Sequence, residues 1–254
     1  MSFRDLHYAD RPLLLPNAWD VPSALAFSDA GYRAIGTTSF GVAASAGHPD
    51  GARSSKEATS ALVRQLQNLP AYVSADVEDG YHDDPDEVAE YIAGLGAAGI
   101  NIEDSTDEKL ISPRAHAAKV AAIKQRSPEV FINARIDTYW LDQDATVSAT
   151  LKRAEAYVDA GADGIFVPGA ADPSNLRELT ANIPVPVNVL VVPQLSLAEL
   201  AELGVRRVST GSLPYRAAID AAVAVAQHIR DGEPPPTATG YPVMQGRLVD
   251  FSGR

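Results

Sequence analysis

The segment AYVSADVEDGYHDDPDEVAEYIAGLGAAGINIEDS, residues 71–105, shows how this chain folds. Short apolar runs at 71–75 and 99–103 are typical of β-strands, and the Ala-rich stretch at 85–98 has a helical pattern that ends at glycine. A strand, a helix and a strand in this order predict two parallel strands joined by a crossover helix. The segment therefore predicts one repeating unit of an α/β fold.

The same alternation continues along most of the chain. Strand candidates lie at 11–15, 33–38, 71–75, 99–103, 130–134, 163–167, 186–190 and 205–209. Helical stretches lie near 21–30, 54–68, 85–98, 113–126, 144–160, 173–181, 196–203 and 213–230. Eight such units in about 230 residues predict a (β/α)8 barrel of the TIM type.

We expect a single domain. No linker, low-complexity tract or shift in composition divides residues 11–230, and α/β barrels commonly reach this length as one unit. The barrel is assigned to residues 1–230. The Pro-rich tail at 231–254 is expected to be a strap across the surface or a subunit contact.

Composition excludes several classes of function. The 254 residues include 21 Lys and Arg against 33 Asp and Glu, a formal net charge of −12 that opposes nucleic-acid binding. The absence of cysteine excludes disulfides, thiolate metal sites and a cysteine nucleophile. We found no apolar run of about 18 residues and no signal peptide, so we expect no membrane association and a cytoplasmic location.

In a TIM-type barrel the active site lies at the carboxyl ends of the strands. Asp76, Glu78 and Glu103 would converge there from neighbouring strand ends, and Asp50 would reach in from the second loop. Carboxylates so close together repel one another unless a cation or a shared proton lies among them. Oxygen ligands suit Mg²⁺ or Mn²⁺ held partly through water. The alternative is a solvated acidic loop.

Other strand ends carry groups that could bind an anion or move a proton. Arg135 follows the apolar run VFIN, where its guanidinium could clamp a carboxylate or form a structural ion pair. Thr38 and Ser39 lie in a turn whose N–H and hydroxyl groups could hold an oxyanion. His48 stands beside a carboxylate motif and could act as acid or base. All five lysines fall on helices or an exposed loop, which opposes a Schiff-base mechanism.

Several motifs together resemble the isocitrate lyase and phosphoenolpyruvate mutase superfamily. The likeness covers about 220 residues and is carried by six segments: LPNAWDVPSALAFSDAGYRAIGTTSFGVAASAGHPDG, ADVEDGY, GINIEDS, NARID, LKRAEAYVDAGADGIFVPG and PVNVL. The resemblance implies an (α/β)8 barrel that assembles as a homodimer or homotetramer with the final helix exchanged between subunits.

The resemblance also implies roles for the site residues. Asp76 would bind Mg²⁺ directly, while Asp50, Glu78 and Glu103 would hold metal-bound waters. Arg135 would bind the carboxylate of a 2-oxo acid. The family pattern usually has Asp at the position of Glu78, a change that lengthens the reach and keeps the charge.

Further roles implied by the resemblance concern the substrate and the proton. Thr38, Ser39 and Phe40 would donate hydrogen bonds to the carboxylate or enolate oxygen, and Asn188 would lie on the outer wall of the pocket. The shared chemistry is cleavage or formation of the bond next to a 2-oxo or 2-hydroxy carboxylate through an enolate-like oxyanion. A water, His48 or Glu103 would then carry the proton.

Departures from the family pattern reduce the number of activities that the resemblance allows. The loop STDEKLISPRAH after the fourth strand contains no cysteine, which opposes isocitrate and methylisocitrate lyase activity. The same loop lacks the Lys-Thr-Asn segment of the mutases, and Gly169 stands where the lyases have Glu. The hydrolase and decarboxylase-like branches remain, which act on oxaloacetate, phosphonopyruvate or a related 2-oxo acid.

The sequence therefore predicts a Mg²⁺-dependent enzyme that cleaves the C–C bond, or the C–P bond, of a small 2-oxo or 2-hydroxy acid. Two other functions stay open. One is a barrel enzyme that binds a phosphorylated substrate through Ser209, Thr210 and Gly211, although these residues equally suit a helix cap. The other is a catalytically idle protein that binds a 2-oxo acid.

Overall fold

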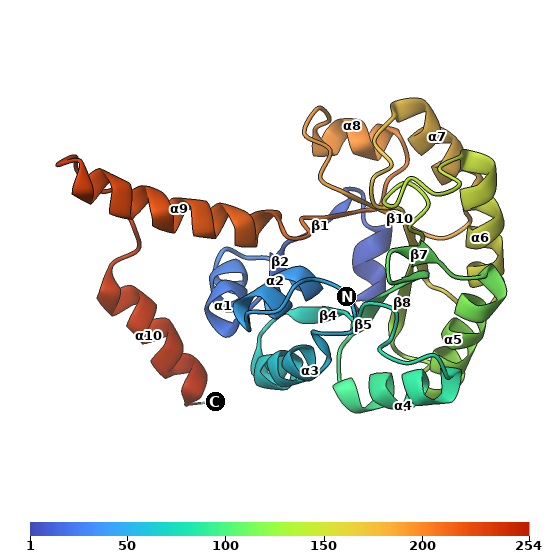
Figure 1. Ribbon diagram of the computed structural model, residues 1–254, viewed down its shortest axis with the longest axis horizontal. Coiled ribbons are helices and arrows are strands. Elements are labelled where there is room, and N and C mark those ends of the chain that lie inside the picture. Colours follow the sequence, from blue (N-terminus) through green and yellow to red (C-terminus); the bar gives the residue numbers. More distant parts are fainter. Residues whose placement is uncertain (254) are drawn as a thin grey trace.

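The computed structural model describes residues 1–253 and confirms the barrel (Figure 1). One parallel sheet has the strand order β1-β11-β10-β9-β8-β5-β4-β3-β2. Its strands are β1 (Leu13–Leu15), β2 (Asn17–Ala18), β3 (Ala34–Thr37), β4 (Tyr72–Asp76), β5 (Gly99–Glu103), β8 (Phe131–Arg135), β9 (Gly164–Phe166), β10 (Val187–Leu190) and β11 (Arg207–Ser209). Each of the eight expected strands is present, with boundaries that differ by a few residues.

The N-terminal strand closes the barrel. β1 and β2 are two halves of one strand, separated by Pro16, which has no N–H to donate to a neighbour. β1 pairs with β11 and β2 pairs with β3, so the two edges of the sheet meet at this strand. The carbonyl of Pro16 still accepts a hydrogen bond from the N–H of Gly36 at 2.8 Å.

Helices occur along the chain where the sequence pattern places them, and all but the last of those expected, α9, surround the sheet. They are α1 (Val21–Asp29), α3 (Lys56–Gln65), α4 (Pro85–Leu95), α5 (Pro113–Arg126), α6 (Val147–Asp159), α7 (Pro173–Asn182), α8 (Leu197–Glu202) and α9 (Leu213–Arg230). Asp84, Ser112 and Asp172 each precede a proline and accept a hydrogen bond from an N–H of the first helical turn. A polar cap followed by proline starts a helix because the cap satisfies a free N–H and proline needs none.

Some elements are additional to the expected ones. They are the helices α2 (Ser39–Ser45) and α10 (Tyr241–Ser252), the 3-10 turn Arg4–Tyr8, and the hairpin β6 (Ser105–Thr106) with β7 (Lys109–Leu110). The expected turn at Thr38 to Phe40 is thus the beginning of α2, with Thr38 as its cap. The 3-10 turn Leu66–Asn68 is the end of the stretch expected near 54–68.

The strand residues alternate between two environments, as the pleat of a strand requires. In β5, Ile100 and Ile102 are fully buried in the main apolar cluster between sheet and helices. The other face of the strands, inside the barrel, is polar. Its hydrogen-bonded side chains are Ser74, Asn101, Asn133, Asn188, Arg207 and Ser209.

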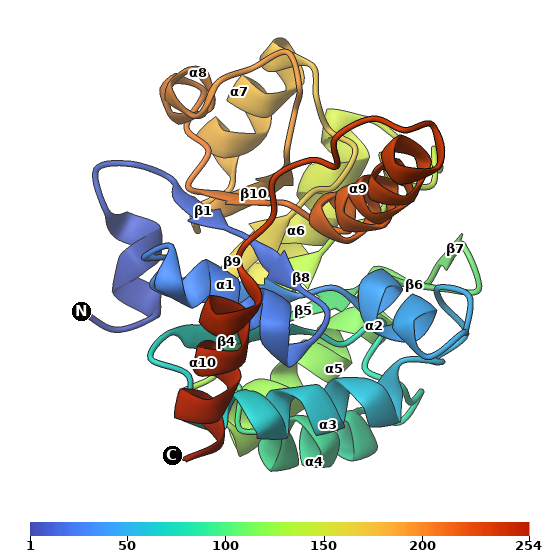
Figure 2. The same ribbon diagram turned by 90° about the vertical axis from the view of Figure 1, so that its left-hand side faces the viewer.

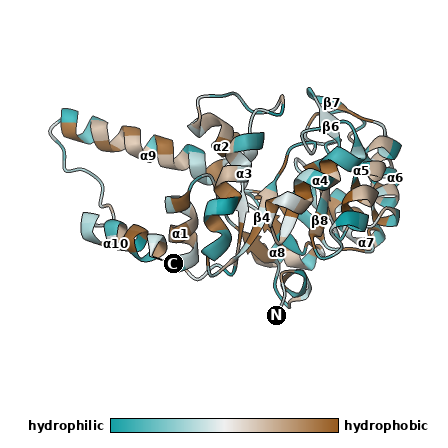
Figure 3. Cartoon of the chain, turned by 90° about the horizontal axis from the view of Figure 1, so that it is seen from below, coloured by the Kyte–Doolittle hydropathy of each residue, from teal (hydrophilic) through white to brown (hydrophobic). Residues whose placement is uncertain are grey.

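The C-terminal part of the chain leaves the barrel. Figures 1 and 2 show α9 projecting away from the sheet and α10 returning beside α1. Arg247 of α10 pairs with Asp29 at 2.7 Å, and Leu248 and Phe251 pack against the core. α9 has no buried residue, and Figure 3 shows apolar positions along it. Within residues 1–253, none of the helices combines the length and the apolar character that crossing a bilayer requires.

Replacing Gly80 by Ala is expected to lower the melting temperature clearly. Gly80 has φ of +90°, and an added Cβ would lie 2.6 Å from Cγ1 of Val88. Positive φ costs alanine about 1–2 kcal/mol, and overpacking adds about 1–3 kcal/mol. The matched control is Gly31→Ala, because Gly31 has the same φ and open space around it. The melting temperature of each variant is measured by thermal unfolding followed by circular dichroism. An equal decrease for both variants would contradict the close packing of Gly80 against Val88.

Candidate active site

Neighbouring strands bring acidic and basic side chains to one mouth of the barrel. Asp76 ends β4, Glu103 ends β5 and Arg135 ends β8. The pairing register places Asp76 beside Asn101, and Glu103 beside Arg135. Since parallel strands present their carboxyl ends on the same side, these groups converge as the sequence predicts.

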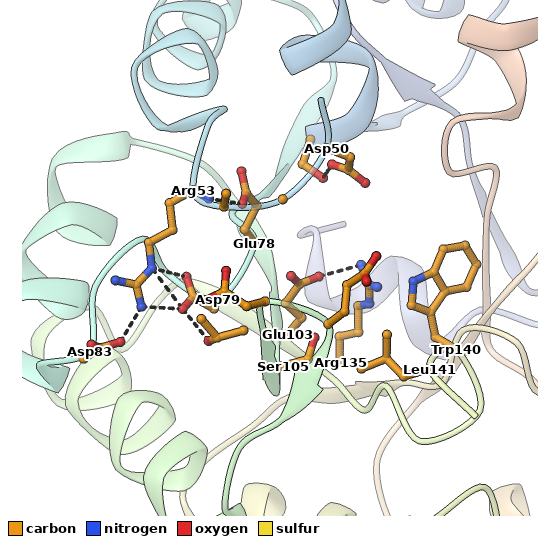
Figure 4. A pocket seen from close by; sticks show the side chains of 16 residues that line it. Asp50, Arg53, Glu78, Asp79, Asp83, Glu103, Ser105, Arg135, Trp140 and Leu141 are labelled. Carbon is orange, nitrogen blue, oxygen red and sulfur yellow. Dashed lines mark hydrogen bonds and ion pairs between the residues drawn. The ribbon is translucent and has the colours of Figure 1, made fainter. Parts of the chain in front are cut away.

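Two adjoining cavities open at this mouth. The smaller one, about 280 Å³, lies over the barrel and is lined by Asp76 and Asn101. The larger one, about 680 Å³, extends under the β6–β7 hairpin and is shown in Figure 4. The residues that line both cavities are Ser39, Asp50, Arg135 and Trp140. The cavities therefore form one continuous site.

Asp76 is held at the mouth by the end of β3 and the start of α2. Its Oδ2 accepts a hydrogen bond from the N–H of Ser39 at 3.0 Å, and its own N–H donates to Oγ1 of Thr37 at 2.8 Å. The hydroxyl of Ser39 donates to Oδ1 of Asp50 at 3.4 Å. Partial loss of hydration and the negative charge of Asp76 raise the pKa of Asp50.

Glu78 is turned toward the loop between α2 and α3. Its Oε1 accepts hydrogen bonds from the hydroxyl and N–H of Ser55, at 2.6 and 3.2 Å, and its Oε2 accepts from the N–H of Arg53 at 2.8 Å. Burial raises the pKa of Glu78 despite these donors. In Figure 4 the carboxylate accordingly points to the loop of Arg53. Glu78 thus fixes the loop that carries Asp50.

The donor set at the mouth suits a hard cation that keeps most of its water. Among residues 1–253, no three His, Asp or Glu side chains stand close enough together to hold an ion directly. Asp76 and Asp50 nevertheless line the same cavity with Arg135. Mg²⁺ commonly takes only one or two carboxylates and retains several waters, so this arrangement fits it.

Arg135 forms ion pairs and also keeps a free edge. Its Nη1 lies 2.8 Å from Oε2 of Glu103, and its Nε donates to Oδ1 of Asp137 at 2.6 Å (Figure 4 labels the first pair). Its Nη2 donates no hydrogen bond to any residue of the described range 1–253. Trp140 and Phe166 lie over the guanidinium, at 5.7 and 6.0 Å from the ring centres. The structural ion pair and the carboxylate clamp are therefore compatible.

The charge of this ion-paired group is fixed by its surroundings. Burial opposes the charge of Arg135, but Asp137, Glu103 and Asp76 together raise its pKa above the ordinary value, so it is always a cation. Burial also raises the pKa of Glu103 well above its usual range, with Arg135 acting in the opposite direction. A carboxyl group with a raised pKa takes up a proton more readily than an exposed one.

The segment after β5 is a short, fixed hairpin. Asp107 and Glu108 form its turn with φ of 50° and 56°, which is typical of a two-residue hairpin turn. Oγ1 of Thr106 donates to Oδ2 of Asp79 at 2.8 Å, and Nε2 of Gln143 donates to the carbonyl of Glu108 at 2.8 Å. Arg53 also holds Asp79, at 2.6 Å. These contacts fix the hairpin over one side of the larger cavity.

The remaining expected residues lie in different places. Phe40 and Thr38 line the smaller cavity. His48 is exposed and is not among the residues that line either cavity. Asn188 is buried inside the barrel, where its Nδ2 donates to the carbonyls of Val189 and Arg207. The roles of His48 and Asn188 in the reaction stay predictions.

The N–H groups expected to bind a phosphate are engaged within the chain. Oδ1 of Asn17 accepts from the N–H of Thr210 at 2.9 Å and from the N–H of Gly211 at 3.0 Å. The hydroxyl of Thr210 donates to the same oxygen at 3.1 Å. These contacts tie the end of β11 to β2, and they do not favour a phosphate cup there.

Sequence reasoning missed Asp137, Trp140 and Asn101. Asp137 and Trp140 follow Arg135 by two and five residues in the segment NARIDTYW. This short distance in sequence could have indicated that both lie near Arg135. Asn101 lies two residues before Glu103, and strand alternation places both on the same face.

The fold and this arrangement define a TIM-type barrel protein with its polar site at the carboxyl ends of the strands. The sequence matches the family model for phosphoenolpyruvate phosphomutase over residues 3–230, and the chain belongs to this family. The family expected from the sequence motifs is therefore confirmed.

Individual relatives give the same result. A Mycobacterium tuberculosis protein described as uncharacterized is 59% identical over 100% of this chain and 98% of its own length. The 2-methylisocitrate lyase of Bacillus subtilis is 31% identical over 80% of this chain and 67% of its own length. A crystal structure of phosphonopyruvate hydrolase with oxalate and Mg²⁺ has a TM-score of 0.85 and 24% identity, covering 100% of this chain and 99% of that one, which shows a shared fold.

Replacing Asp50 by Asn is expected to raise the melting temperature at pH 7 in the presence of a chelator. The native pKa of Asp50 is raised, so its charged form destabilises the folded state above that pKa. Asn mimics the protonated form, so the gain should shrink as pH falls through the native pKa and vanish below the unfolded value of about 3.9.

The control for this experiment is Glu129→Gln, which removes an exposed charge just before β8, at the opposite end of the barrel. Thermal unfolding at several pH values measures both variants. A melting temperature for D50N that lies below the native one at pH 7 would show that the Asp50 carboxylate is not repelled at this site.

Proposed function

We propose that this protein is a divalent-metal-dependent enzyme that cleaves the C–C bond, or less readily the C–P bond, beta to the carboxylate of a small 2-oxo or 2-hydroxy acid. One observation carries the proposal. Arg135, whose Nη2 makes no hydrogen bond within residues 1–253, lines one cavity together with Asp76 and Asp50. A metal ion held by the aspartates and the guanidinium of Arg135 could together bind the 2-oxo and carboxylate groups of the substrate.

The metal would be held mainly by Asp76. Asp50 and Glu103 border the same continuous site and would contact metal-bound waters, while Glu78 supports the loop of Asp50. Either Mg²⁺ or Mn²⁺ suits this oxygen-only set. When bound, such an ion supplies Lewis-acid stabilisation of a developing negative charge on the substrate oxygen.

The substrate carboxylate would lie against Arg135. Glu103 and Asp137 hold the guanidinium by Nη1 and Nε, so that its remaining edge is oriented without help from the substrate. Prior orientation lowers the entropy cost of binding a carboxylate in a fixed position. The turn from Thr38 to Phe40 would donate further hydrogen bonds to the carboxylate or enolate oxygen.

Glu103 is better placed than His48 to carry the proton. Glu103 lines the larger cavity, whereas His48 lies at neither cavity. Burial raises the pKa of Glu103 well above its usual range, so this carboxyl group takes up a proton more readily than an exposed glutamate does. We therefore assign the proton transfer to Glu103, and we keep water as the alternative carrier.

The decarboxylase and hydrolase branches fit this chain better than the methylisocitrate lyase branch. The chain contains no cysteine, so the β6–β7 hairpin cannot supply a cysteine thiol as the acid over the site. The contacts of Thr106 and Gln143 hold the hairpin in place, so it does not supply a long closing lid. A small substrate such as oxaloacetate or phosphonopyruvate is consistent with the 280 Å³ cavity.

We further propose that α9 packs on a second copy of the chain, in a homodimer or homotetramer. Ile219, Val223 and Ile229 of α9 are 50%, 50% and 63% exposed. An apolar helix that stands away from its own barrel loses this exposure only by binding another surface. Exchange of this helix between subunits would provide such a surface.

Replacing Asp76 by Ala is expected to abolish Mg²⁺ binding measured by calorimetry, because the direct ligand is lost. Replacing Arg135 by Met should leave Mg²⁺ binding in place and weaken oxalate binding roughly 10- to 100-fold, because a hydrogen-bonded charge pair is removed. An NMR screen of 2-oxo acids with the native protein would then identify the substrate.

Two results would contradict the proposed function. Unchanged cation affinity in D76A would remove the metal site from the barrel mouth. Tight binding of a 2-oxo acid without turnover of any candidate would instead support an idle binding protein.

Replacing Val223 by Asp is expected to shift the protein from oligomer to monomer, because a charge in an apolar contact is costly to desolvate. The matched control is Ala221→Asp, which places the same charge at an exposed position on another side of the same helix. Light scattering coupled to size-exclusion chromatography measures the mass of each variant. A native protein that is already monomeric would disprove the helix exchange.

A further inference from the structure

The interior of the barrel contains a buried arginine without an acidic partner. Arg207 of β11 is fully buried, and it forms no ion pair within residues 1–253. Its partners are neutral: Asn101 at 3.0 Å, Ser209 at 3.4 Å and Ser74 at 3.5 Å. Its Nη1 has no partner in the described chain. Barrel interiors are usually filled by branched apolar side chains, so this cation calls for a physical explanation.

The contacts of Arg207 fix the orientation of one amide. Nη2 of Arg207 and Nδ2 of Asn133, at 3.0 and 2.8 Å, both donate to the same atom of Asn101. A guanidinium has donors and no acceptor, so the atom that faces it must be the amide oxygen. The side chain of Asn101 therefore cannot rotate by half a turn without losing both hydrogen bonds.

The other end of this amide is a free donor at the cavity. Nδ2 of Asn101 donates to no residue in 1–253, and it is not among the atoms buried there without a partner. Asn101 lines the smaller cavity and is the register partner of Asp76. The residue is only 4% exposed, so its N–H₂ group lies at the floor of that cavity.

We propose that Asn101 is a further substrate-binding residue, whose N–H₂ donates to a carboxylate or 2-oxo oxygen, and that Arg207 is its positioning residue. This inference rests on the proposed function. It assigns a donor on the floor of the cavity in addition to the clamp of Arg135 on its side. The buried charge of Arg207 favours a negatively charged ligand above it, because the interior screens charge weakly.

The neighbouring amide of Asn188 shows the contrast. Its Nδ2 donates to the carbonyls of Val189 and Arg207, and its Oδ1 accepts from Asn133 and Ser209. Each of these atoms is used within the barrel. Asn101 differs because one of its two polar groups is left for a ligand.

Calorimetry with Mg²⁺ followed by oxalate tests the inference on two variants. Asn101→Ala removes the donor, and oxalate affinity should fall at least about 10-fold while Mg²⁺ affinity is unchanged. Asn101→Asp replaces the donor by a charged oxygen, and oxalate affinity should fall roughly 100-fold. N101D should still fold, because one of its oxygens accepts from Arg207 and Asn133 and its negative charge lies beside the cation of Arg207. Thermal unfolding measures its stability. Its Mg²⁺ affinity should be equal or higher.

The role of Arg207 is tested by asking whether the losses of oxalate affinity caused by substitutions at Arg207 and Asn101 add up. Arg207→Met removes one of the two donors that hold the Asn101 amide and should weaken oxalate binding several-fold in the native background. In the N101A background the same change should have no further effect, because Arg207 acts through Asn101. An equal loss in both backgrounds would overturn the positioning role. If R207M does not fold, the N101D variant carries the test of the donor alone.

The outcomes separate this inference from the proposed function. A native protein that binds neither Mg²⁺ nor oxalate would overturn both. A native protein that binds both ligands, with N101A and N101D binding oxalate within twofold of it, would overturn the role of Asn101 and leave the proposed function intact. Loss of Mg²⁺ affinity together with oxalate affinity in both variants would indicate structural damage and would also overturn the specific role.

Discussion

The balance of charge around Arg135 is the constraint on which the barrel mouth depends. Asp137 and Glu103 hold this buried guanidinium, at 2.6 and 2.8 Å, while Asp76 and Asp50 border the same cavity. More negative than positive groups therefore meet in one poorly hydrated place. Burial first, and then the neighbouring carboxylates, raise the pKa of Asp50 and of Glu103. Such an excess is stable when a cation binds or a carboxyl keeps its proton. Both are features that a lyase of 2-oxo acids would use.

The loops at the mouth are held by side chains that do not themselves face the reaction. Glu78 accepts hydrogen bonds from Ser55 and Arg53, and so carries the loop of Asp50 to the barrel. Asp79 connects Arg53 to Thr106 of the hairpin. The three loops are linked in this way into one rim. A rim fixed by ion pairs orients the site in advance.

Hydrogen bonds inside the barrel also fix the positions of side chains below the site. Asn101, Asn133 and Asn188 are linked to one another and to Arg207 by hydrogen bonds. A buried polar network is stable only when nearly all its groups are paired, and it then specifies one arrangement of side chains. Within residues 1–253, the network groups without a hydrogen bond include Nη1 of Arg207 and, at the cavity, Nδ2 of Asn101. The network therefore leads from the middle of the barrel to the floor of the site.

Periodicity and capping signals in the sequence determined the fold, since the eight strands and their helices occur where the pattern predicts them. They also placed Asp76, Glu103 and Arg135 at one mouth, because strand ends in a parallel barrel share one side. Only the tertiary structure decided which way each side chain turns. Glu78 faces a loop 25 residues away in sequence, and Asn101 meets Arg207 across 106 residues. Local sequence sets the face on which a residue lies, whereas its partners depend on distant segments that are brought together by folding.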